Sequence, residues 1–154
     1  MTSITSNDLL VLRKGDEASI TRVFQKYDVQ TFADLTGDNN PIHLDEAYAA
    51  TTPFKHCIVH GKLVEGLVSA VLGTELPGPS SIFRTTTAKF HAPVYLGEQI
   101  TATVRVRGLA PGKDNWVILD FWVRTRTDEF TNGLVLSGEV VMTLPKGKLD
   151  FRSS

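Results

Sequence analysis

The longest run of regularly spaced apolar residues lies between residues 58 and 74. Its apolar side chains recur at helical spacing but occupy more than one face, and small residues fill the positions between them. A surface helix would carry a charged stripe, whereas this segment has only Lys62 and Glu65, both near its start. The pattern therefore predicts a central, largely buried helix, which ends at the turn of residues 76–79.

Four segments after this helix have the pattern of β-strands. They cover residues 82–90, 100–107, 117–123 and 134–142. Turn-forming residues separate them where hairpins need them, among them Pro93, Gly97, Pro111-Gly112 and Asn132-Gly133. Residues 17–24 alternate apolar and polar side chains, so an opening strand is predicted before the helix.

One apolar helix followed by consecutive antiparallel strands packs most economically as a curved sheet wrapped around the helix. The expected fold class is therefore α+β. Strong curvature needs bulges and glycines, for which Gly108 and Gly138 are candidates. Such a small sheet leaves an edge strand exposed, and pairing with a second copy would cover it, so we expect a homodimer.

Two short helices are predicted between the opening strand and the long helix. Asp28 is expected to cap the first, over residues 29–36, and Gly37 to stop it. Asp45 is expected to cap the second, over residues 46–50.

The 154 residues are 42% hydrophobic and 21% charged, the size and composition of one globular domain. We expect a single domain over residues 1–154, with tails at about 1–14 and 146–154. A net charge of −1 argues against a nucleic-acid surface, which needs clustered Lys and Arg. No apolar run approaches the ~20 residues of a membrane span, and residues 1–12 do not resemble a secretory or transit signal. The expected location is the cytoplasm, with the mitochondrial matrix as the alternative.

The segment between the two short helices carries an acid and a base. Asp38 and His43 lie five residues apart, and Pro41 between them restricts the loop of residues 38–44 to few conformations. One acid and one base that reach the same small molecule are what the addition or removal of water requires. The alternative is that Asp38 caps a turn and His43 is an ordinary surface residue.

The start of the long helix is a second candidate element. A helix N-terminus presents N–H groups without an intrahelical acceptor and a partial positive charge. Gly61 has no side chain to block approach, so a carbonyl oxygen that gains charge could be held there. The alternative is that Gly61 only permits close packing.

Three histidines and Asp45 suggest a metal site. His56 and His60 are four residues apart, the spacing of two ligands on one helical face. The predicted helix starts too late to hold both, and no third ligand, from His43 or elsewhere, is spaced to join them. No metal is therefore predicted.

Residues 28–97 resemble the MaoC-like (R)-specific enoyl-CoA hydratases and the related mitochondrial 3-hydroxyacyl-thioester dehydratases. The resemblance rests on four stretches: residues 32–45 (FADLTGDNNPIHLD), 58–61 (IVHG), 72–79 (LGTELPGP) and 90–97 (FHAPVYLG). The first is highly specific, because the acid, Asn-Pro and His stand in fixed register.

The resemblance implies a hot-dog fold and a dimer whose active site lies near the subunit interface. It assigns catalysis to Asp38 and His43, and it places the backbone N–H that binds the substrate carbonyl at Gly61. Ser69 takes the place of the family's small hydroxyl residue and is expected to support the site as a buried, hydrogen-bonded group. Asn40 completes the predicted substrate-binding set.

The implied reaction interconverts trans-2-enoyl and (R)-3-hydroxyacyl thioesters of coenzyme A or acyl carrier protein. No cofactor is expected, because the thioester itself acidifies C2. We expect Asp38 to take the proton of water and protonated His43 to deliver one to C2. The alternatives are a hot-dog acyl-CoA thioesterase and a non-catalytic thioester-binding domain.

Two remaining features are expected to be structural. Four arginines gather in two predicted strands and are interpreted as a solvated face, with contact to carrier phosphates as the alternative: Arg105, Arg107, Arg124 and Arg126. The single cysteine, Cys57, excludes an intrachain disulfide and is expected to be a small buried residue instead of a nucleophile.

Overall fold

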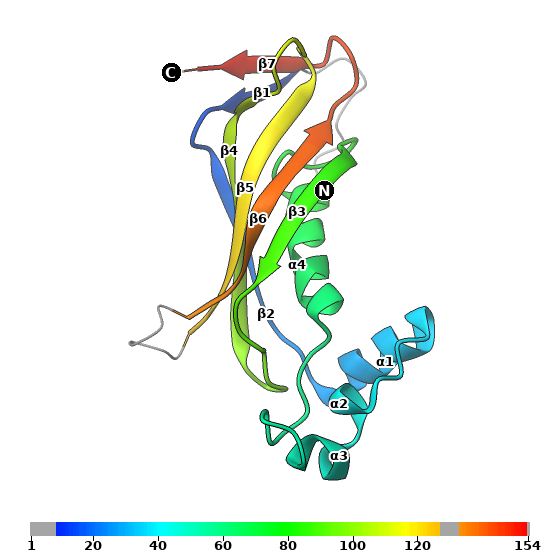
Figure 1. The fold of residues 1–154 in the computed structure, drawn as a ribbon. Helices are drawn as coiled ribbons and strands as arrows, with labels where there is room; N and C mark the ends of the chain where they lie inside the picture. The colour runs from blue at the N-terminus through cyan, green and yellow to red at the C-terminus, as the bar shows by residue number, and fades with distance from the viewer. Residues whose placement is uncertain (1–8, 127–132, 154) are drawn as a thin grey trace.

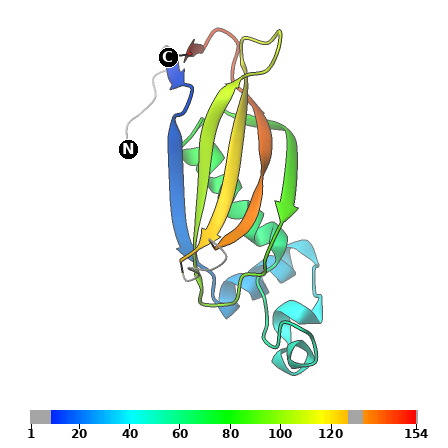
Figure 2. The ribbon, with the colours of Figure 1, turned by 60° about the vertical axis from the view of Figure 1, so that its left-hand side comes forward.

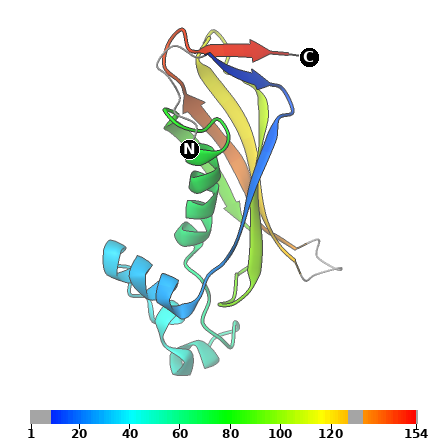
Figure 3. The ribbon, with the colours of Figure 1, turned by 180° about the vertical axis from the view of Figure 1, so that it is seen from behind.

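The computed structural model describes residues 9–126 and 133–153. Five antiparallel strands form one curved sheet in the order β2-β4-β5-β6-β3, and helix α4 lies along one face of it (Figure 1, Figure 3). The elements are β2 (Glu17–Val23), α4 (Gly61–Thr74), β3 (Ile82–Phe90), β4 (Gln99–Leu109), β5 (Trp116–Thr125) and β6 (Leu134–Thr143). The predicted α+β hot-dog arrangement, a curved antiparallel sheet around a central helix, is confirmed.

The hydrophobic core lies between α4 and the sheet. Alternate residues of β5 are fully or almost fully buried, namely Val117, Leu119, Phe121 and Val123, as the period of two predicts. They face a helix whose buried residues are Val64, Leu67, Val68, Val71 and Leu72. Each such side chain contributes about 1.5–3 kcal/mol by leaving water, so this interface holds the helix against the sheet.

The helix is less buried than its pattern predicts. Lys62, Gly66, Ser69 and Gly73 are exposed and share one face of α4. The prediction of a largely buried helix is therefore wrong for this face, because small residues need no burial and leave no polar signature that distinguishes a covered face from an open one.

Strand pairing departs from simple chain order. β3 pairs with β6, not with β4, and the chain crosses from β3 at one edge to β4 beside the other edge strand, β2 (Figure 2). The expectation that consecutive strands are neighbours is therefore wrong for β3. Alternation reports that a strand has a buried face but carries no information about its partner.

One of the two predicted bulge glycines is confirmed. The β4–β5 register shifts between Val106 and Gly108. At Gly138 the register is continuous, so that prediction is wrong. Gly138 serves close packing instead, because a Cβ there would lie 2.0 Å from the Thr87 carbonyl oxygen and 2.5 Å from Cζ of Phe121.

Parts of both predicted tails are ordered strands. β1 (Leu10–Arg13) and β7 (Leu149–Arg152) pair in parallel, and Leu12 is buried in the core. The prediction of tails is wrong for these residues, since four-residue strands are too short to show a periodic pattern. Residues 1–8 and 154 lie outside the described residues.

Three helices form a cluster beyond the N-terminal end of α4 (Figure 1, Figure 3). They are α1 (Lys26–Thr36), α2 (Pro41–Leu44) and α3 (Glu46–Ala50). α1 begins three residues earlier than predicted, with Gln25 as its N-cap; Asp28 accepts from the Gln25 backbone N–H instead of being the cap itself. The stop at Gly37 and the Asp45 cap of α3 are confirmed. No described helix is both long enough and apolar enough to span a bilayer.

Candidate functional site

The acid-base loop is built by two helix ends. α1 stops at Gly37, whose φ of 80° turns the chain, and α2 starts at Pro41, the first residue of that helix. The segment predicted as loop therefore contains one helical turn. Asn40 caps α2 through a 3.3 Å bond from the Ile42 N–H to its Oδ1. Its predicted contact with substrate stays a prediction.

His43 is half-buried and held in one orientation. Its Nδ1–H donates to the Ile58 carbonyl oxygen over 2.8 Å. Because a carbonyl oxygen only accepts, the neutral ring keeps its free lone pair on Nε2. Burial lowers the pKa of His43 and nearby His60 lowers it further, whereas the Ile58 bond and the Asp38 carboxylate act in the opposite direction. The net lowering favours a neutral imidazole, which can accept a proton.

The structure brings a third group to this pair, which the sequence analysis considered only as a metal ligand. One nitrogen or oxygen atom from each of Asp38, His43 and His60 lies within 4.8 Å of the other two. His60 is 1% exposed, and its ring centroid is 3.9 Å from that of His43. The IVHG stretch of residues 58–61 contains this histidine, but its pattern predicted a role in the reaction for Gly61 and not for His60.

The ligand atoms of Asp38, His43 and His60 lie close enough together to hold a cation, a set that spacing along the chain did not predict. His60 Nε2 is engaged by the Asp38 carbonyl oxygen, so its buried Nδ1 is the nitrogen left to act as a ligand. His56, four residues before His60, precedes α4 as predicted, and its Nδ1 lies 3.4 Å from Glu46 Oε2. The absence of a bound metal stays a prediction.

α4 begins at Gly61, three residues later than predicted, and Gly61 lies at the helix start as expected. A Cβ at this position would lie 2.9 Å from the Phe90 ring at the end of β3. Its N–H belongs to the first turn, where backbone donors have no intrahelical acceptor. The Gly61 N–H is therefore a backbone donor beside the loop of Asp38 and His43, and no side chain at this position blocks access to it.

Ser69 does not match its expected environment. It is exposed and makes no hydrogen bond with the described residues, so the prediction of a buried, hydrogen-bonded hydroxyl is wrong. It lies on the wall of a cavity of about 240 Å³ between α4 and the sheet. The apolar part of this cavity is formed by Val68, Leu72, Phe83, Phe121 and Val140. A small aliphatic group suits this lining.

A second cavity, of about 510 Å³, is lined in part by His43. Lys26, Asp45, Glu46 and Leu96 contribute to its walls. The half-buried His43 ring is therefore accessible from this cavity.

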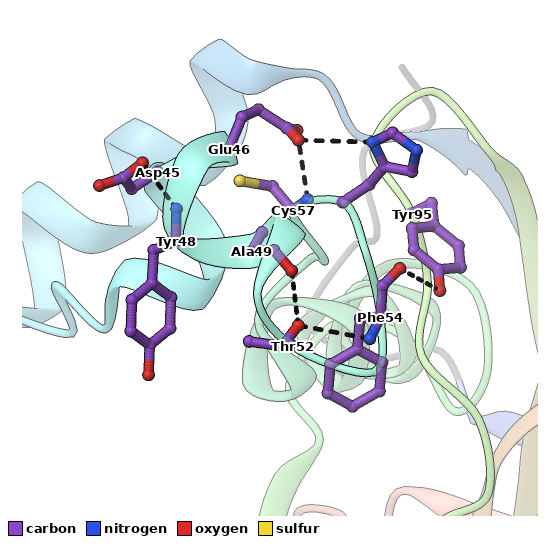
Figure 4. Close-up of polar contacts among 9 residues, drawn as sticks. Asp45, Glu46, Tyr48, Ala49, Thr52, Phe54, Cys57 and Tyr95 are labelled. Atoms are coloured by element: carbon purple, nitrogen blue, oxygen red, sulfur yellow. Dashed lines mark hydrogen bonds and ion pairs between the residues drawn. The ribbon is translucent and has the colours of Figure 1, made fainter.

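Two hydrogen bonds, one from α3 and one from Tyr95, hold the segment before Ile58 in place (Figure 4). The Cys57 N–H donates to Glu46 Oε1 over 3.2 Å, and the Tyr95 hydroxyl donates to the Phe54 carbonyl oxygen over 3.0 Å. These bonds fix the backbone that presents the Ile58 carbonyl to His43. Cys57 itself is buried as predicted, and burial raises the pKa of its thiol to about 11, which keeps it protonated and poorly nucleophilic.

Two of the four arginines are engaged on the outer face of the sheet. Arg105 pairs with Glu17, and Arg107 pairs with Asp120 and Glu139. This pairing supports the interpretation of a solvated face for Arg105 and Arg107.

Comparison with known proteins places this geometry in context. Residues 12–119 match the family model described as MaoC like domain. The chain is 40% identical over 148 residues to an (R)-specific enoyl-CoA hydratase of Rhodospirillum rubrum, covering 92% of this chain and 98% of the relative. It is 30% identical to a mitochondrial 3-hydroxyacyl-[acyl-carrier-protein] dehydratase of Arabidopsis thaliana, covering 93% and 82%. The solved (R)-hydratase from A. caviae involved in PHA biosynthesis superimposes with a TM-score of 0.80 at 39% identity, over 87% of this chain and 98% of that one.

Proposed function

The chain belongs to the MaoC-like domain family, and on that premise we propose that it is an (R)-specific hydro-lyase for trans-2-enoyl and 3-hydroxyacyl thioesters. The observation that carries the proposal is the closeness of the Asp38 carboxylate to a half-buried His43 whose pKa is lowered by burial. Coenzyme A is the proposed carrier, by similarity to the hydratase relatives; the dehydratase relatives make acyl carrier protein the alternative.

The proposed mechanism starts from the neutral imidazole. Asp38 and His43 hold one water; His43 Nε2 takes a proton from it while the oxygen bonds to C3 of the enoyl group. The electron pair of the C2=C3 bond moves toward the thioester carbonyl, whose oxygen is held at the Gly61 N–H. The imidazolium then returns the proton to C2, so one water is added in total and addition is syn.

This division of roles differs from the one expected from the sequence, in which Asp38 takes the proton. A lowered His43 pKa favours the imidazole as the base, and the exposed Asp38 carboxylate is suited to orient water and stabilise the imidazolium. Dehydration runs through the same steps in reverse.

The mechanism predicts a pH profile. Hydration needs neutral His43, and burial lowers the pKa of this residue below its ordinary value of 6.5. The kcat/KM for crotonyl-CoA should therefore fall only as the pH drops through a value below 6.5, and should be flat between pH 7 and pH 8. A rate that instead rises on acidification below pH 6.5 would show that the imidazolium is the active form in hydration.

The proposed place of the acyl chain is the apolar cavity beside Ser69. The Ser69 hydroxyl is exposed and has no partner among the described residues, so it is free to bond to substrate or water. One ordinary hydrogen bond is worth about 1 kcal/mol, and Ser69→Ala should therefore lower kcat/KM by about tenfold or less. Steady-state kinetics on crotonyl-CoA measure this. A loss as deep as that of Asp38→Asn would make Ser69 a primary catalytic group.

We further propose a homodimer formed through the β3 edge. β3 is an edge strand of the sheet, and its apolar residues Ile82, Phe83 and Phe90 are 65%, 44% and 48% exposed. Edge pairing with a second copy would cover them, and light scattering should give twice the chain mass of 16.9 kDa. A monomer at micromolar concentration would contradict this prediction.

The proposed function is tested with purified protein and crotonyl-CoA. Loss of the enoyl-thioester absorbance without release of free thiol is expected; release of thiol would indicate a thioesterase, and no turnover a binding domain. The product should be a substrate for an (R)-specific 3-hydroxyacyl-CoA dehydrogenase. Rapid NADH formation with an (S)-specific enzyme alone would contradict the proposed stereochemistry.

A further inference from the structure

His60 is a buried titratable residue that the mechanism above does not use. Among the described residues, four polar or charged side chains are buried, and His60 is the titratable one. It occupies the N-cap position of α4, yet its side chain makes no capping bond. Its imidazole instead lies between the Phe32 ring, at 4.7 Å between centroids, and the His43 ring, at 3.9 Å. The His60 side chain therefore contacts the candidate site instead of capping its own helix.

Both polar groups of the site are in contact with this one residue. The His60 Nε2–H donates to the backbone carbonyl oxygen of Asp38 over 3.0 Å, which fixes the peptide that carries the carboxylate. The same ring stacks on His43, whose Nδ1 is held by Ile58, two residues before His60. One side chain therefore contacts both the peptide of the acid and the ring of the base.

Packing alone does not explain the choice of histidine here. His60 Nδ1 is buried and has no hydrogen-bond partner in the described part of the chain. A buried polar atom without a partner destabilises the folded state, whereas an apolar ring of similar size would fill the space without this penalty. A buried polar atom without a partner beside a candidate active site indicates that the residue is kept for function.

We propose that His60 is a positioning residue that holds the Asp38 peptide and the His43 ring in the relative geometry that proton transfer needs. This inference rests on the proposed function. His60 acts through its neighbours and is not itself the base, because its Nε2–H is engaged by Asp38 and its Nδ1 is closed off from solvent. Since a displacement of 1 Å can lower a rate by about 10²-fold, its effect should fall on kcat.

Two substitutions separate the two contacts. His60→Phe keeps a ring to stack on His43 but loses the donor to Asp38, whereas His60→Gln keeps a donor and loses the ring. We expect each to lower kcat for crotonyl-CoA hydration by about 10- to 100-fold, with KM within about threefold of wild type. His91→Gln is the matched control, because His91 is exposed and bonds to Ser137 at 2.7 Å, outside the site. Its kcat should stay at the wild-type value.

A thermal melt and a double-mutant cycle distinguish positioning from a merely structural role. The Tm of His60→Phe should stay within a few degrees of wild type, because removal of the buried atom without a partner offsets the loss of the bond to exposed Asp38. In an Asp38→Asn background, where the positioned carboxylate is already lost, His60→Phe should lower kcat by less than about threefold. This non-additivity is the signature of a residue that acts through Asp38.

Several outcomes would overturn the proposal. A wild-type kcat in both His60 variants would overturn it. If Asp38→Asn were slow in the same assay, the proposed function would still stand. A loss of rate in proportion to a loss of Tm would make His60 a structural residue, and a full additional loss in the Asp38→Asn background would make it an independent group. A wild-type rate in Asp38→Asn itself would overturn the proposed function and this inference with it.

Discussion

Asp38→Asn and His43→Gln should each lower kcat for crotonyl-CoA hydration by about two to four orders of magnitude, the usual size of a general acid-base contribution. Asparagine keeps the shape of Asp38 but lacks the negative charge that stabilises the imidazolium. Its NH2 group also replaces one of the two oxygens that can accept a hydrogen bond from water. Glutamine at position 43 has no group that can take a proton near neutral pH. Both effects should appear in kcat more than in KM, because the lost interactions act on the transition state.

The folded state should survive both substitutions, because Asp38 is exposed and His43 is only half-buried. Asp34→Asn is a matched control for the first: Asp34 lies on α1, is exposed, and accepts a 2.9 Å bond from Gln30. Its rate should equal that of wild type. A folded Asp38→Asn or His43→Gln variant that retains most of the wild-type rate would remove that residue from the proposed mechanism.

Gly138→Ala should destabilise the fold severely. The added Cβ would meet the Thr87 backbone oxygen at 2.0 Å and the buried Phe121 ring at 2.5 Å, and neither can move without opening the β3–β6 pairing or the core. Overpacking typically costs about 1–3 kcal/mol and occasionally more, and a clash with backbone places this site at or above the upper value. A loss of about 3 kcal/mol lowers Tm by roughly 6–12 °C in a chain of this length.

Gly108→Ala provides the control for this prediction. It is the same substitution on the neighbouring part of the sheet, and a Cβ at Gly108 would have no atom within 4 Å. Its Tm should change by less than a few degrees when both variants are compared with wild type by thermal unfolding. Equal stability of the two variants would show that β3 and β6 adjust their spacing at Gly138.

Local patterns predicted the elements well where the pattern is long. The strand at residues 82–90 matches β3 at both ends, and the remaining strands of the sheet match within three residues. The helix stop at Gly37 is also a local feature, because it depends on the left-handed backbone that glycine adopts easily. The same is true of the Asp45 cap, whose side chain bonds to the first turn of the helix that follows it. These features need no information from distant residues.

The candidate acid and base were accessible to sequence reasoning for a related reason. Asp38 and His43 are close in the chain, with Pro41 between them, so their proximity is a local property. The resemblance to the MaoC-like family added their roles, and the family itself is confirmed by the match over residues 12–119.

The sequence by itself therefore determined the fold class, the family and the loop that carries the proposed acid and base. The tertiary structure alone decided that β3 pairs with β6, that β1 pairs with β7, that Ser69 faces an open cavity, and that His60 stacks on His43. The physical reason is distance along the chain. Periodicity reports whether a residue has a buried face, whereas the identity of the group packed against that face depends on how separate segments meet; His60 bonds to a peptide 22 residues away.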